Sequence, residues 1–133
     1  MKHFVAYHST DAMGHELEHG SEFRFYSSKP RAFLEQAIGE RVWVITGTRD
    51  DAGSMIYRLA EVYTPLEISV ADTGGFAFSV VGHEGRAIQP AIILNHFEWF
   101  RNLRRSLANF SLGFSEIRQP EVISGLTELV PSN

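Results

Sequence analysis

Four β-prone runs follow one another in the middle of the chain, with only short polar or glycine-containing connections between them. They cover residues 41–46, 55–63, 66–71 and 76–81. Short alternating runs separated by turns of this kind are typical of antiparallel hairpins. The first run, Arg-Val-Trp-Val-Ile-Thr, is too apolar for an edge strand that faces water on both sides. It is therefore predicted to be a central strand of the sheet.

The flanking sequence adds further strands. β-prone runs at residues 4–7 and 22–27 predict two strands near the start of the chain, and residues 110–117 are expected to close the sheet. Residues 87–94 fit either extended chain or a turn. Residues 9–20 fit either a short helix or a loop, because glycine lies inside the segment.

Proline and glycine mark two of the expected helices. Pro30 and Gly39 enclose a predicted helix over residues 31–38, since proline is favoured in the first helical turn and glycine just past the last. In the same way, Pro120 opens a predicted helix over residues 121–130.

A third helix is predicted from Asn95, as its N-cap, to Leu107. Apolar residues at positions 97, 100, 103 and 107 recur at helical spacing and define one face. The other side carries three basic residues, which are Arg101, Arg104 and Arg105. The segment is therefore expected to be an amphipathic, locally basic helix.

The length and composition fit one domain over residues 1–133, since 44% of the 133 residues are hydrophobic and 21% are charged. The expected class is α+β, with a curved, mostly antiparallel sheet or pseudo-barrel flanked by small helices. No apolar stretch has the length of a signal or membrane segment, which predicts a cytoplasmic protein without a membrane partner.

The composition also excludes several chemistries. The chain has no cysteine, so disulfides, thiolate catalysis and cysteine-containing metal sites are excluded. No serine lies in a G-x-S-x-G or S-x-x-K motif, and the glycines lack the spacing of a phosphate-binding loop. We expect no cofactor. The net charge of −4 gives no global positive field, so nucleic-acid binding would need a local basic face.

One segment matches a catalytic motif. His15-Glu16-Leu17-Glu18-His19 fits H-E-x-x-H, in which two histidines one helical turn apart bind zinc and the glutamate activates water. Such a pair must project from a stable helix, whereas Gly14 precedes it and Gly20 follows it directly. A small zinc-dependent hydrolase, with His15 and His19 as ligands and Glu16 as base, is therefore kept as an alternative function.

Four segments near the ends of predicted elements carry short motifs. They are Tyr7-His8-Ser9-x-Asp11-x-Met13-Gly14, Phe25-Tyr26-Ser27-Ser28-Lys29, Gly39-Glu40-Arg41-Val42-Trp43-Val44-Ile45 followed by Tyr57-Arg58-Leu59, and Asn109-Phe110-Ser111-Leu112-Gly113-Phe114. In this order the chain resembles the PUA-like superfamily, in particular EVE-type and related small bacterial domains. PUA-like proteins often carry Gly-Asp before a barrel strand, where this chain has Gly39-Glu40.

The resemblance implies a nucleobase pocket on the open side of the sheet, often for a modified base. A base lifted from the stack needs an aromatic surface to replace lost stacking, and hydrogen bonds to identify it. Stacking is implied for Tyr7, Tyr26 and Trp43, and Asp11 would accept a hydrogen bond from an exocyclic amine such as cytosine N4. The remaining edge contacts would come from His8, Ser9, Ser27 and Asn109.

Each assignment has a structural alternative. A tryptophan inside an apolar strand, as Trp43 is, more often packs half-buried, and Asp11 fits a helix cap. Asn109 fits a turn before the last strand. The candidate phosphate-binding residues are Lys29, Arg31, Arg101, Arg104 and Arg105, for which the alternative is a solvated helix face.

We therefore hypothesise a non-enzymatic module that recognises a modified or flipped nucleobase, with modified cytosine in DNA expected rather than RNA. Such modules serve as the specificity part of restriction or defence systems, in which a nuclease is another domain or chain. The alternatives are the zinc hydrolase and a small-molecule-binding domain whose pocket is unrelated to nucleic acid.

Overall fold

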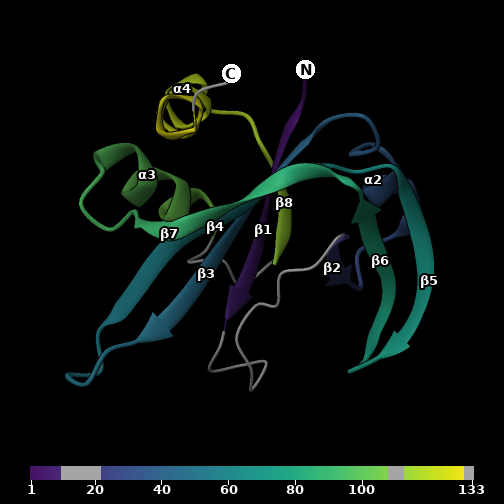
Figure 1. Cartoon of the computed structure of the whole chain (residues 1–133), viewed down its shortest axis with the longest axis horizontal. Helices are drawn as coiled ribbons and strands as arrows, with labels where there is room; N and C mark the ends of the chain where they lie inside the picture. The colour runs from purple at the N-terminus through teal and green to yellow at the C-terminus, as the bar shows by residue number, and fades with distance from the viewer. Residues whose placement is uncertain (10–21, 108–112, 131–133) are drawn as a thin grey trace.

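The computed structural model of the chain describes residues 1–9, 22–107 and 113–130 (Figure 1). Its elements, in chain order, are β1 (His3–Ser9), β2 (Phe23–Ser27), α2 (Arg31–Glu35), β3 (Arg41–Arg49), β4 (Met55–Thr64), β5 (Glu67–Thr73), β6 (Phe76–Gly82), β7 (Glu84–Ile93), α3 (Glu98–Ser106), β8 (Phe114–Ile117) and α4 (Pro120–Leu129). Strands dominate and the helices are few and small, which confirms the α+β class in its coarse form.

The described strands form two sheets. One has five strands in the order β7-β4-β3-β1-β8, and the other has three in the order β2-β6-β5. β1 pairs with β3 in parallel, whereas the other described pairs are antiparallel. The pairing is thus mostly antiparallel, as predicted, but the described strands do not close into one barrel.

The five-stranded sheet separates two apolar cores. α3 and α4 cover one of its faces, and the three-stranded sheet with α2 lies on the other (Figure 1). We call these the helix-side core and the intersheet core. From the covering elements, the helix-side core takes Phe100, Leu103, Val122 and Leu126, and the intersheet core takes Phe25, Leu34, Ile68 and Val80.

The strand β3 contributes to both cores. Trp43 and Ile45 belong to the helix-side core, while Val42 and Val44 belong to the intersheet core. This alternation follows from the period of two residues along a strand. Since β1 and β4 pair with its two edges, the prediction of a central strand is confirmed.

The helices α3 and α4 approach each other at a glycine. The ring of Trp99 in α3 lies against Gly125 in α4, and a Cβ added there would fall 2.3 Å from Cε2 of the ring. Only glycine leaves room for this approach. It allows α3 to lie over the sheet with Phe100 and Leu103 buried.

The predicted start of the third helix is wrong. Phe97, not Asn95, occupies the N-cap position of α3. The Asn95 side chain instead accepts a hydrogen bond from the backbone N–H of Tyr57 at 2.8 Å and donates one to the carbonyl of Met55 at 2.8 Å. These bonds satisfy backbone groups of β4 just beyond the last residue pair with β7. The asparagine therefore completes a sheet edge rather than a helix.

Most of residues 87–94 belong to the strand β7, which confirms the extended alternative. The helix α2 ends at Glu35, before the predicted limit at residue 38. A turn carries the chain from α2 to Gly39, which has a φ of 79°. Among the described residues, no helix is long and apolar enough to span a membrane.

Candidate nucleic-acid interface

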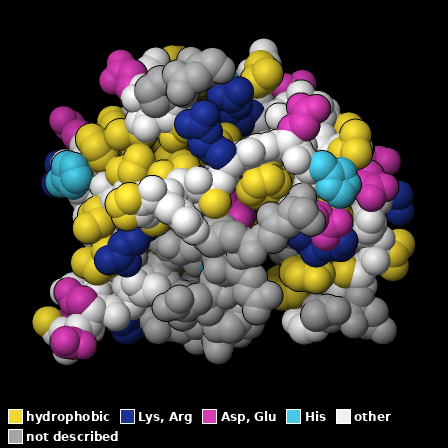
Figure 2. Space-filling model, in the orientation of Figure 1, with side chains coloured by type: hydrophobic (Ala, Val, Ile, Leu, Met, Phe, Trp, Pro, Cys, Tyr) yellow, Lys and Arg dark blue, Asp and Glu magenta, His cyan; other side chains and the backbone are white. Residues whose placement is uncertain are grey.

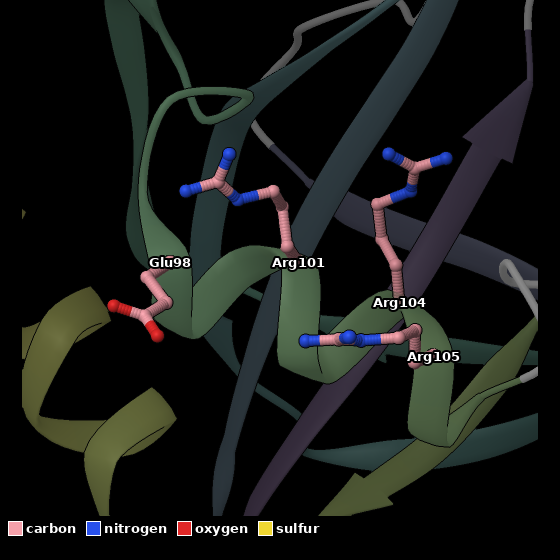
Figure 3. A pocket seen from close by; sticks show the side chains of 4 residues that line it. All are labelled: Glu98, Arg101, Arg104 and Arg105. Atoms are coloured by element: carbon pink, nitrogen blue, oxygen red, sulfur yellow. The ribbon is translucent and has the colours of Figure 1, made fainter.

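Three arginines of α3 gather around one cleft (Figure 3). Arg101, Arg104 and Arg105, together with Glu98, line a hollow of about 480 Å³ that is open to the surface. Residues at positions i, i+3 and i+4 are neighbours on a helix, so local spacing alone brings the three side chains together. The structure thus assembles three of the five predicted phosphate-binding residues.

The packing of α3 decides which side of the helix carries the cleft. Phe100 and Leu103 are fully buried in the helix-side core, while Arg101 and Arg105 are exposed and Arg104 lies at the margin of the core against Tyr57. The end of α3 is fixed to the segment before α4, because Gln119 Nε2 donates to Ser106 Oγ at 2.8 Å. The cleft therefore rests on a helix anchored at its face and at its end.

Arg104 is the most constrained of the three arginines. Its guanidinium carbon lies 4.5 Å from the centroid of the Tyr57 ring, and this ring packs against Phe100 at 5.4 Å between centroids. Tyr7 lies beside Tyr57 at 6.0 Å. An arginine on an aromatic face is held by cation–π attraction and stacking. The aromatic side chains thus fix the guanidinium at the cleft.

The Nε atom of Arg104 is buried and has no hydrogen-bond partner within the part of the chain that the structure describes. A buried donor without an acceptor costs about 1–3 kcal/mol. Figure 3 shows the guanidinium groups of Arg101 and Arg104 directed to the same side of α3. An anionic ligand in the cleft could offer acceptors to both.

The remaining cleft residues are exposed. Arg105 donates to the side-chain oxygen of Asn102. With three guanidinium groups and the single carboxylate of Glu98, the lining carries a net charge of +2, against −4 for the chain. Such a local excess of positive charge attracts anions even though the protein as a whole is acidic.

Two of the three predicted stacking residues, Tyr7 and Trp43, belong to the helix-side core. Trp43 is fully buried, its Nε1 donates to Nδ1 of His3 at 3.1 Å, and the two rings stack at 6.2 Å. Tyr7 is half-buried, with its hydroxyl end against Gly47, where a Cβ would not fit. The tryptophan is a packing residue with no open ring face for a base.

The third predicted stacking residue, Tyr26, lies in the other sheet. Its ring stacks on Phe76 at 6.2 Å within the three-stranded sheet. The structure therefore does not bring Tyr7, Tyr26 and Trp43 around one pocket.

Three buried polar side chains face the space between the two sheets. His8 follows Phe4 and Ala6 on the intersheet face of β1, and Ser27 follows Phe25 on the facing side of β2. Glu61 lies opposite Val44 in the five-stranded sheet, on the same face. They are 4%, 5% and 3% exposed, respectively. We call His8, Ser27 and Glu61 the intersheet polar group.

Glu61 was missed by the sequence analysis because a bulge changes the side on which it lies. Strict alternation would place it with Tyr57 and Leu59 in the helix-side core. The register shifts between Leu59 and Glu61, so Val62 joins the helix-side core and Tyr63 the intersheet core. Burial, and next the charge of Glu61, raises the pKa of Tyr63 above its ordinary value. The Glu61 carboxylate thus lies on the intersheet side of β4.

Tyr57 is the other residue that was missed. It was assigned to a strand, but no local signal connects it with an arginine of a helix that begins at residue 98. The sequence did show that Tyr57 alternates with Leu59 on the apolar face of the strand. That pattern places Tyr57 beneath the basic helix only when the order of the strands in the sheet is also known.

The other two predicted phosphate-binding residues lie elsewhere. Lys29 Nζ is 5.9 Å from the Phe33 ring centroid. Arg31 begins α2 and forms an ion pair with Glu35 at 3.8 Å. Since α2 packs on the intersheet side, these cations and the α3 arginines lie on opposite sides of the five-stranded sheet.

Several predicted residues lie outside the described part of the chain. They are Asp11, Asn109 and the motif residues His15, Glu16 and His19, while Ser9 is the last residue of β1. Within residues 1–9, 22–107 and 113–130, no group of three or more histidines and carboxylates could hold a metal ion.

No protein-family model and no curated protein matches this chain in sequence. The resemblance to PUA-like domains therefore stays a prediction.

Proposed function

We propose that the chain is a non-enzymatic nucleic-acid-binding module that recognises a modified or flipped nucleobase, with DNA as its ligand. The arginine cleft of α3 carries this proposal. Arginine forms paired hydrogen bonds with phosphate, and contacts of this type position a protein on nucleic acid. A local phosphate contact needs a small basic cluster, and the three arginines of α3 supply one on an otherwise acidic protein.

Recognition of the base is assigned to the intersheet polar group. A base would have to displace contacts that these side chains already make, since Ser27 Oγ accepts from the backbone N–H of Lys29 at 3.1 Å and His8 and Glu61 also interact within the chain. Glu61 would then accept a hydrogen bond from an exocyclic amine, the role predicted for Asp11, and His8 and Ser27 would complete the edge contacts. Burial favours discrimination between bases, because a buried polar group left without a hydrogen-bond partner costs more free energy than an exposed one. In a restriction or defence system, strand cleavage would come from a nuclease on another domain or chain.

The distribution of charge supports local rather than extensive contact. On the face shown in Figure 2, acidic and basic side chains are interspersed and form no continuous basic band. A module of this type gains affinity from one cleft and one base site, and binds unmodified DNA weakly at physiological salt.

The test is fluorescence anisotropy with matched DNA duplexes, with and without cytosine modifications, over a series of salt concentrations. The double variant R101Q/R105Q should weaken binding to every duplex and reduce the salt slope by about 1 for each phosphate that is no longer bound. The matched control is R86Q, which removes an exposed arginine of β7 outside the cleft. An unchanged slope in the double variant would contradict the proposal.

Binding to no duplex would favour the small-molecule-binding alternative. Zinc analysis of the purified protein, with and without EDTA, separates the hydrolase alternative, because that enzyme requires stoichiometric metal.

A further inference from the structure

The arginine cleft has features that a site for an extended phosphate backbone does not need. Its three arginines lie within two turns of one helix and surround a single hollow of about 480 Å³. The guanidinium groups of Arg101 and Arg104 are directed to one side of α3, whereas Arg105 extends in another direction (Figure 3). This arrangement matches a small, highly charged group.

The surroundings of the cleft support the same interpretation. Glu98 lies in its lining, and the other predicted phosphate ligands, Lys29 and Arg31, are on the opposite side of the five-stranded sheet. Neither of these two cations continues a track from the cleft. Arg118, which precedes the Gln119 that bonds to Ser106 of α3, forms an ion pair with Glu116 at 3.4 Å. A strand that ends at the cleft fits this distribution better than one that passes through it.

Arg104 adds a fixed point inside the cleft. Its guanidinium is held 4.5 Å from the Tyr57 ring, and its buried Nε has no acceptor among the described residues. A planar guanidinium can donate from its two terminal nitrogens to two oxygens of the same group. The structure thus holds a donor in place before any ligand arrives, which lowers the entropic cost of binding.

We propose that the α3 cleft binds the terminal phosphate of a nucleic-acid strand, a phosphate monoester, with Arg104 as its anchor and Arg101 and Arg105 as additional donors. This inference rests on the proposed function, since it makes the strand end the ligand. A monoester carries a charge of about −1.5 to −2 at neutral pH and has three terminal oxygens, whereas a backbone diester carries a single charge. Arginines that line one hollow favour the more highly charged of these groups.

The experiment compares single strands of one sequence that carry a 5′-phosphate, a 3′-phosphate or hydroxyl groups at both ends. One of the phosphorylated strands should bind about tenfold more tightly than the hydroxyl strand, as expected for a hydrogen-bond pair to a charged group. The variant R104K keeps the positive charge but loses the planar pair of donors. It should abolish the preference for the phosphorylated strand while retaining binding to both, and R86Q should preserve the preference.

The other outcomes separate the two proposals. Equal affinity for all three strands would overturn the terminal-phosphate assignment and leave nucleic-acid binding intact. Absence of binding to all strands and duplexes would overturn both. Inorganic phosphate that binds as tightly as the phosphorylated strand would assign the cleft to a free anion and overturn the strand end as ligand. A preference that survives in R104K would remove Arg104 as anchor.

Discussion

At the scale of single residues, two buried aromatic side chains of the helix-side core differ in what lies against them. Trp43 has its indole N–H bonded to His3 and is fully buried, so replacing it would test stability rather than binding. Tyr57 is also buried, but Arg104 lies on its ring at the edge of a cleft. Both rings therefore belong to the core, and the Tyr57 ring in addition holds the Arg104 guanidinium at the cleft.

The bond between Trp43 and His3 predicts a pH dependence of stability. Nδ1 of His3 accepts this bond, and an imidazolium has no acceptor, so folding favours neutral His3. Burial, followed by the charge of Arg41, lowers the pKa of His3 below the ordinary value of 6.5. At a pH between the lowered pKa and 6.5, the unfolded chain binds more protons than the folded chain. The contribution of neutral His3 to the free energy of unfolding is therefore complete above pH 6.5, and it is lost as the pH falls from 6.5 to the lowered pKa.

Urea denaturation at several pH values measures this effect. The difference in unfolding free energy between the wild type and H3A should rise with pH up to about 6.5 and then stay constant. The control is H96Q, which changes an exposed histidine in the loop before α3. A difference between wild type and H3A that does not vary with pH would rule out His3 as the titrating group.

At the scale of elements, the contact between α3 and α4 decides where the cleft lies. Helix propensity predicts that G125A gains about 1 kcal/mol, since alanine is the better helix former. The Trp99 ring occupies the space of the new methyl group, so we expect the reverse, a loss of about 1–3 kcal/mol through overpacking.

Thermal denaturation checks this prediction, with S124A as the control at a neighbouring exposed position of α4. The double variant G125A/W99A should show a coupling energy, because removal of the indole makes room for the methyl group. If G125A were more stable than the wild type, the close approach of the two helices would be wrong.

The comparison with the sequence predictions shows which patterns are local. The i, i+3, i+4 spacing of the α3 arginines was sufficient to predict their assembly, because one helix brings them together. The bulge that moves Glu61 to the intersheet side, and the use of Asn95 by β4, depend on pairing between distant strands. The parallel pairing of β1 and β3 likewise has no local signal. Periodicity therefore predicted elements, but not the sides on which their polar residues lie.

At the scale of the whole molecule, the five-stranded sheet separates the two proposed sites. The arginine cleft lies on its helix side, and Glu61 with His8 and Ser27 lies on its intersheet side. We expect the first to set affinity for any sequence and the second to set base preference. Such a division requires that the two sites act independently.

A double-mutant cycle in DNA binding tests this division. E61Q should reduce the preference for modified over unmodified duplex while leaving the salt slope unchanged, and R101Q/R105Q should do the opposite. The effects should add in the combined variant within about 0.5 kcal/mol. Circular dichroism must first show that E61Q is folded, because Glu61 is buried. Strong coupling between the two changes would indicate one shared site.

The position of β1 also has a consequence for how the protein reaches its native state. This strand lies between β3 and β8, and His3 pairs with Ile117, a separation of 114 residues. A nascent chain therefore exposes one hydrogen-bonding edge of β1 until residues 114–117 have been synthesised. Pairing across such a long loop is slow and leaves an edge open to other chains.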